Sequence, residues 1–117
     1  MSELVEVETS DLVGAALDWA VAKVEGVELA LVGAYPHVVV GGRLLGNYRP
    51  STDWSQCGPL IERFRVSIIY SDEVCDPCAW TDSSASWHAP TPLITACRAI
   101  VASVLGETVS VPKELLS

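Results

Sequence analysis

Basic residues are scarce in this chain. Lysine and arginine number 7 against 15 acidic residues, which gives a formal net charge of −8. No segment gathers Lys or Arg into a stripe that could displace counterions from phosphates, so the composition argues against nucleic-acid binding. The carboxylates are scattered, and charged residues make up only 19% of the chain. We therefore expect the charge to keep a small domain soluble; an acidic decoy of a DNA-binding protein is the alternative.

Long apolar runs and an export signal are also missing. No run reaches the ~18 residues that a membrane span needs. Residues 1–6 lack the basic start and apolar core of a secretion signal. A chain of 117 residues, half of them hydrophobic, can bury the core of one domain. The sequence thus predicts a single domain, residues 1–117, in the cytoplasm and with no membrane association.

Histidine is limited to His37 and His88. Nucleophilic catalysis by a hydroxyl or thiol needs a base and an orienting group beside the nucleophile. His37 opens a β-branched segment and His88 precedes a proline-rich helix start. Nothing local aims either imidazole at Ser51, Ser55 or Cys57. We therefore predict no enzyme, no catalytic residue and no cofactor.

The cysteines number four, and free thiols are the default for them in a reducing cytosol. Cys75 and Cys78 have the spacing of half a zinc site, which His88 and Cys97 could complete. One pair alone is weak, and Cys97 falls on an apolar stripe where a thiol behaves as a small hydrophobe. Acidic neighbours of the pair also oppose a redox dithiol. A zinc- or thiol-dependent module using these four residues is thus an alternative, and the prediction is no metal site.

A helix is predicted for residues 9–26, where apolar residues recur along one face. Thr9 or Ser10 can cap its first amide groups, and Gly26 can take the left-handed conformation that ends a helix.

A second helix is predicted for residues 90–106. Thr91 is a good N-cap, Pro92 sits where a missing amide hydrogen costs nothing, and Gly106 closes the far end. Its wide apolar stripe must pack against another layer.

Strands are predicted from β-branched runs and period-two alternation. Residues 27–32 and 37–40 form a hairpin, residues 64–70 a half-buried strand, and residues 78–81 and 86–88 shorter pieces. The order of these elements predicts an α+β fold: an antiparallel sheet of four to five strands, with the N- and C-terminal helices packed on one face.

Residues 49–63 lie between the predicted hairpin and the next strand and are expected to form a short irregular or helical insert. Prolines bound the segment, and the bulky indole of Trp54 is predicted to wedge under the helices. The alternative is a protein-contact patch of Arg49, Asp53, Trp54 and Arg63, because Trp and Arg most often dominate interfaces.

Three parts of the chain resemble the phage NinX-like family: residues 12–26, residues 49–54 (Arg-Pro-Ser-Thr-Asp-Trp) continuing into 58–63, and residues 90–99 with 101–103. The family consists of small proteins of bacteriophages and of prophages in bacterial genomes. Cys57 departs from the family pattern, where a second glycine is usual, and Cys75 and Cys78 lie in a variable stretch.

The resemblance implies a phage or prophage accessory protein that works in the cytoplasm of the bacterial host, and it carries over no catalytic residue. With no assembled chemistry in the sequence, we expect a non-enzymatic protein-binding domain whose partner is a host or phage protein.

Overall fold

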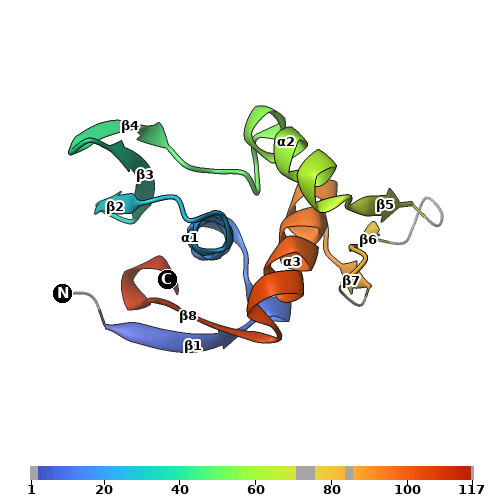
Figure 1. Ribbon diagram of the computed structural model, residues 1–117. Helices are drawn as coiled ribbons and strands as arrows, with labels where there is room; N and C mark the ends of the chain where they lie inside the picture. Colours follow the sequence, from blue (N-terminus) through green and yellow to red (C-terminus); the bar gives the residue numbers. More distant parts are fainter. Residues whose placement is uncertain (1–2, 71–75, 84–85, 117) are drawn as a thin grey trace.

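The computed structural model describes residues 3–70, 76–83 and 86–116 (Figure 1). No helix within these ranges is both long and apolar enough to span a bilayer. The elements follow one another as β1 (Leu4–Glu8), the 3-10 turn η1 (Thr9–Asp11), α1 (Gly14–Glu25), β2 (Leu29–Val32), β3 (Tyr35–Val40), β4 (Arg43–Asn47), α2 (Trp54–Phe64), β5 (Ser67–Ile69), β6 (Cys78–Trp80), β7 (Trp87–His88), α3 (Pro92–Leu105), β8 (Thr108–Pro112) and the 3-10 turn η2 (Lys113–Leu116).

Helices α1 and α3 pack together at the centre of the molecule, with α2 beside α3 and small sheets around them (Figure 1). Leu17 and Val21 of α1 are fully buried, as are Ile100 and Val101 of α3, and all four belong to one core. Because burying an aliphatic side chain contributes ~1.5–3 kcal/mol, this helix pairing is a major source of stability.

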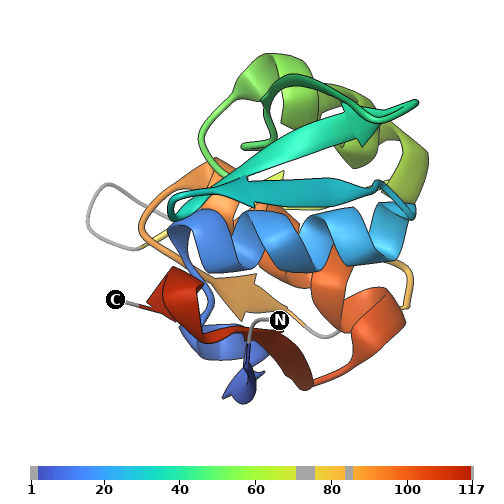
Figure 2. The same ribbon diagram turned by 90° about the vertical axis from the view of Figure 1, so that its left-hand side faces the viewer.

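The strands form three antiparallel sheets with the orders β1-β8, β2-β3-β4 and β5-β6-β7. The first sheet joins the two ends of the described chain, with Val5 opposite Val111 and Val7 opposite Val109. Strands β2 and β3 run alongside α1 (Figure 2). Each sheet is too small to form a layer by itself, so the helices provide the common core.

The α+β class is confirmed, but the predicted single sheet of four to five strands is wrong. The predicted hairpin pairs with β4 and not with the strands that follow α2. Helix α2 is the reason, because it lies between β4 and β5 in the chain, packs on α3 and separates the two groups of strands. The helices therefore lie between sheets and not on one face of one sheet.

The two helix ends predicted from glycine, and the N-cap of α3, are confirmed. Thr91 Oγ1 accepts a hydrogen bond from the Ile94 amide at 3.1 Å. Gly26 ends α1 in the left-handed conformation with φ 70°. Gly106 follows α3, also with positive φ, and donates its amide to Ala102.

The predicted N-cap of the first helix is wrong. Helix α1 begins only at Gly14, after the turn η1, and its N-cap residue Val13 has no capping side chain. The hydroxyl of Thr9 instead donates to the Gly106 carbonyl at 2.8 Å, while Ser10 is exposed. Thr9 thus ties the start of the helical core to the turn after α3.

Helix α2 has 11 residues and passes through Gly58 and Pro59, within the segment for which a short irregular or helical insert was predicted. Four apolar residues at helical spacing pack on the core: Cys57, Leu60, Ile61 and Phe64. This amphipathic face explains the helix, because its burial outweighs the single backbone hydrogen bond that Pro59 cannot donate.

The strand predicted for residues 64–70 is shorter than expected. Phe64 ends α2, Arg65 takes a left-handed conformation, and β5 covers only Ser67–Ile69. Tyr70, the last residue of the predicted strand, lies beyond β5 and is 63% exposed. The two shorter pieces are confirmed as β6 and β7, which pair with each other.

Candidate functional site

The N-terminal end of α2 brings together three of the four predicted contact residues. Asp53 is the N-cap, and its Oδ1 accepts the Ser55 amide at 2.9 Å and the Ser55 hydroxyl at 2.6 Å. Its Oδ2 lies 3.7 Å from Arg49 Nε. The hydrogen bonds from Ser55, assisted by the Arg49 charge, lower the pKa of Asp53. Asp53 therefore fixes both the start of α2 and the position of Arg49.

Trp54 does not wedge under the helices as predicted, since it is 57% exposed. Cys57, Leu60 and Phe64 define the buried face of α2. At 3.6 residues per turn, Trp54 lies about 80° from the middle of that face. The indole is thus directed to one side of α2 and not beneath it.

Arg63 is separated from the other three contact residues. It lies at the far end of α2, about 14 Å along the helix axis from Trp54. Its guanidinium pairs with Glu25 of α1 and lies over the Phe64 ring, 5.4 Å from the ring centroid. Arg63 therefore joins α2 to α1 and lies apart from Arg49, Asp53 and Trp54.

Trp54 forms one wall of a hollow of about 240 Å³ between the N-terminal ends of α2 and α3, which we call the Trp54 hollow. Pro92, Leu93 and Ile94 supply the apolar wall opposite, and Thr91 lies at the start of α3. The hollow is thus a concave, mainly apolar surface next to an exposed tryptophan.

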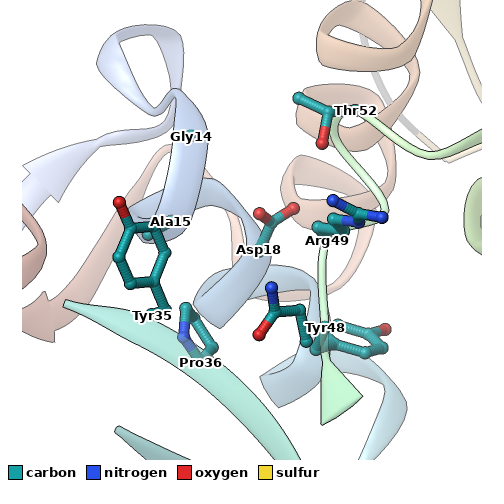
Figure 3. Close-up of a pocket in the computed structure, with 9 residues that line it drawn as sticks. Gly14, Ala15, Asp18, Tyr35, Pro36, Tyr48, Arg49 and Thr52 are labelled. Carbon is teal, nitrogen blue, oxygen red and sulfur yellow. The ribbon is translucent and has the colours of Figure 1, made fainter. Parts of the chain in front are cut away.

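A second hollow, of about 260 Å³, adjoins the first at Thr52, which lines both of them. We call it the Asp18 hollow. In Figure 3, Asp18 lies between Tyr35 and Pro36 on one side and Arg49 and Thr52 on the other. The full lining consists of Gly14, Ala15, Asp18, Tyr35, Pro36, Asn47, Tyr48, Arg49 and Thr52. This site was not predicted from the sequence, although Asp18 is a signal for it, since it is the one charged residue in the otherwise apolar stretch 12–22.

Asp18 is only 4% exposed, and its Oδ1 accepts the Ser51 amide at 2.8 Å. Burial raises the pKa of this carboxyl to about 6, against smaller lowering effects of the Ser51 amide and hydroxyl. The Ser51 hydroxyl is itself buried without a hydrogen bond of ordinary geometry. Asp18 is therefore mostly ionised at neutral pH in a site that favours its neutral form.

Beneath this hollow lies a buried thiol pair, in which Cys57 of α2 and Cys97 of α3 are 3.9 Å apart at their sulfur atoms. The hydrogen bond with Cys57, together with burial, raises the pKa of Cys97. Burial also raises the pKa of Tyr48, with smaller contributions from Cys97, Asp18 and Cys57. A thiolate is strongly disfavoured at Cys97, which suits packing and not nucleophilic attack.

The proposed zinc ligands are only partly brought together. Cys78 and His88 are cross-strand partners in β6 and β7, whereas Cys97 lies in the core against Cys57. Cys75 lies outside the described residues. Within the described ranges, no three His, Cys, Asp or Glu residues form a group that could hold a metal ion.

The two candidate catalytic bases lie in sheets on different sides of the helices. His37 is in β3, where its Nδ1 is 3.1 Å from the Tyr35 carbonyl oxygen. His88 is in β7, and its carbonyl accepts a hydrogen bond from the buried Arg98 at 3.0 Å. Among the described contacts, neither histidine is hydrogen-bonded to Ser51, Ser55 or Cys57, the nucleophiles considered from the sequence.

These features define a small α+β protein with a helical core and two adjoining surface hollows on either side of Thr52. The family model described as Bacteriophage P22, NinX matches residues 8–104. The chain therefore belongs to this phage NinX family. A comparison with curated proteins gave no match.

Proposed function

We propose that this phage-family protein is a non-enzymatic accessory protein that binds a host or phage protein in the bacterial cytoplasm, and that Trp54 anchors the contact. The observation that carries this proposal is the 57% exposure of Trp54 at the edge of the Trp54 hollow. Tryptophan is among the residues that contribute most to protein interfaces, especially where it flanks a pocket.

The chemistry of the hollow indicates what it accepts. Trp54, Pro92 and Ile94 give it apolar walls, while Thr91 and Thr52 place hydroxyl-bearing residues at its edge. An apolar side chain of the partner fits such a surface, with the rim hydrogen-bonded to the partner's backbone. Arg49 lies nearby but is paired with Asp53, and Arg63 lies at the other end of α2.

The test is affinity capture from infected host cells, followed by a binding titration with the captured protein. We expect Trp54→Ala to weaken binding at least tenfold, because truncating an interface tryptophan commonly costs ~2 kcal/mol or more. Tyr70→Ala is the matched control, since Tyr70 is also aromatic and 63% exposed but lies beyond β5. Equal binding by wild type and Trp54→Ala would contradict the proposed anchor.

Salt dependence separates this proposal from an acidic decoy. An apolar contact at Trp54 should change little between low and high salt, whereas a decoy acting through its net charge of −8 should weaken steeply. The titration is therefore run at both ionic strengths.

A metal-binding module is a second candidate, favoured by the cross-strand pairing of Cys78 with His88. Opposite residues of an antiparallel pair place their side chains on the same face, which suits two ligands of one ion. Stoichiometric zinc in the purified protein, lost in both Cys78→Ser and His88→Ala, would support it. Metal-free protein that gains no stability from added zinc would exclude it.

A further inference from the structure

The Asp18 hollow contains a buried charge without a counterion. Ion pairs join Arg49 with Asp53, Arg63 with Glu25, and Lys113 with Glu3. None of them includes Asp18, whose carboxylate is 4% exposed. A buried, unpaired carboxylate is costly, so a cation placed beside it is strongly favoured.

The carboxylate can accept a further hydrogen bond from such a cation. Oδ1 accepts the Ser51 amide, the Ser51 hydroxyl also interacts with the carboxyl, and two carboxylate oxygens offer more acceptor positions than these two groups use. Asp18 is one of the residues that line the hollow, and Figure 3 shows it at the centre of them. An incoming donor can therefore meet the carboxylate without displacing the Ser51 amide.

The walls of the hollow suit an aliphatic stem. Ala15, Pro36 and the rings of Tyr35 and Tyr48 are largely apolar, and Tyr35 is 66% exposed at the edge. A volume of about 260 Å³ lies just below the roughly 300–1,000 Å³ of ordinary small-molecule sites. The space thus favours a slender ligand over a large one, and an aromatic ring can further stabilise a cation.

The adjoining surface is also acidic. A further hollow of about 340 Å³ shares Gly14, Ala15 and Tyr35 with the Asp18 hollow and is lined by Asp11 and Glu114 as well. Carboxylates on one side of a cleft raise the local concentration of cations. Asp11 of the adjoining hollow therefore adds to the negative potential near Asp18.

We infer that the Asp18 hollow binds the primary ammonium group of a slender aliphatic amine, either as a free amine or as a lysine side chain of another protein. The site does not depend on Trp54, and the proposed protein-binding function can fail without affecting it.

An ammonium fits this site better than a guanidinium. The Ser51 amide already uses one acceptor position of Oδ1, so a bidentate guanidinium would have to share that oxygen, whereas an ammonium is a compact charge that needs only one strong acceptor. Arg49 at the edge of the hollow does not fill the role, because Asp53 holds it from the other side.

The inference is tested with n-butylammonium and Nα-acetyl-lysine amide as probes, followed through backbone amide shifts in NMR spectra. We expect saturable shifts at residues 15, 18, 47, 51 and 52, with a Kd on the order of 1 mM for so small a ligand. Binding of n-butylammonium alone assigns the site to free amines. Binding of both probes would show that the hollow can also accept the side chain of a lysine residue.

Charge and shape controls separate this binding from weak surface attraction. Doubly acetylated lysine amide, which is neutral, should not bind, and acetyl-arginine amide should bind more weakly. Asp18→Asn should lose at least tenfold in affinity, and Ala15→Leu should block the hollow without changing the charge. Glu62→Gln, at an exposed position on α2, removes the same charge elsewhere and should have no effect.

Acidification provides an independent readout. Asp18 is faced by Ser51 and by the weakly acidic groups Tyr48, Cys57 and Cys97, with Arg49 on the same hollow. Burial raises the pKa of Asp18 to about 6, while the pKa values of Tyr48 and Cys97 lie above their ordinary values. Binding should therefore fall as pH is lowered through about 6 and Asp18 gains a proton. Absence of saturable binding by both ammonium probes, or equal binding by Asp18→Asn, would overturn the inference.

Discussion

Asp18 lies in the middle of α1, where it accepts the Ser51 amide and makes no ion pair within the described residues. Its pKa of about 6 is higher than the model-peptide value of 3.8, so the folded protein binds this proton more tightly than the unfolded chain. The free energy of unfolding therefore falls as pH rises from about 4 to 6, because Asp18 loses its proton more readily in the unfolded chain. Above pH 6 this destabilisation is complete and no longer changes with pH.

We therefore predict that Asp18→Asn is more stable than wild type at pH 7.5, by up to roughly 3 kcal/mol, since each pKa unit corresponds to 1.36 kcal/mol. The gain should be nearly lost at pH 3, where Asp18 is mostly protonated in both states. Urea unfolding at pH 3 and 7.5 measures both values. A gain that does not depend on pH would show that the charge of Asp18 is not its cause.

Single residues also mark the limit of the sequence analysis. Thr91 and Gly26 act as predicted because capping depends on a few neighbouring backbone groups. Trp54 was misplaced because its exposure depends on where α2 meets α3, which local sequence does not contain. Asp18 was not predicted as a site residue because its environment depends on a hydrogen bond from Ser51, which is 33 residues away in the chain.

At the scale of elements, the end of α2 stores a small strain. Arg65 is the only described non-glycine residue with positive φ, at φ 54° and ψ 49°. A residue with a Cβ atom costs ~1–2 kcal/mol in this conformation. Glycine would remove that cost, but part of the gain is offset because glycine makes the unfolded chain more flexible.

We predict that Arg65→Gly raises the free energy of unfolding by roughly 0.5–1 kcal/mol. The side chain of Arg65 makes no ion pair within the described residues, so little is lost on its removal. Urea denaturation provides the measurement, and Arg65→Ala is the control because it keeps the Cβ atom and should give no gain. A gain of the same size for Arg65→Ala would assign the effect to charge and not to backbone strain.

The packing of α2 on α3 predicts the behaviour of its thiols. Cys57 and Cys97 have no exposed surface, whereas Cys78 in β6 is partly exposed. In the native protein, iodoacetamide should modify Cys57 and Cys97 roughly 100-fold or more slowly than Cys78, because they react only through opening of the helix pair. Site-resolved mass spectrometry measures the rates. Comparable rates at all three sites would mean that α2 separates readily from α3.

For the whole molecule, local sequence could predict most elements but not their assembly. The alternation of residues 4–8 and 108–112 is as regular as that of the strands that were predicted, yet neither segment suggests a partner. Their pairing joins residues more than 100 positions apart, such as Leu4 with Pro112. The division into three sheets likewise depends on the packing of α2, which no single segment reveals.

This pairing makes a strong prediction about the residues matched by the family model. Residues 8–104 exclude nearly all of β1 and the whole of β8. They also lack Val109, Val111 and Leu115, which are buried in the common core. At ~1.5–3 kcal/mol for each buried aliphatic side chain, the loss approaches the ~5–15 kcal/mol that stabilises an entire domain.

We therefore expect a chain of residues 8–104 to lack cooperative unfolding and dispersed amide signals, although it contains all three helices except Leu105 at the end of α3. A chain of residues 3–116, which keeps both strands, should fold like the full protein. Val111→Ala in the full chain provides the graded test, with a loss of about 1–3 kcal/mol. If residues 8–104 unfold cooperatively with unchanged stability, the helices and the other two sheets suffice for the fold, and the β1-β8 pair is only an addition to it.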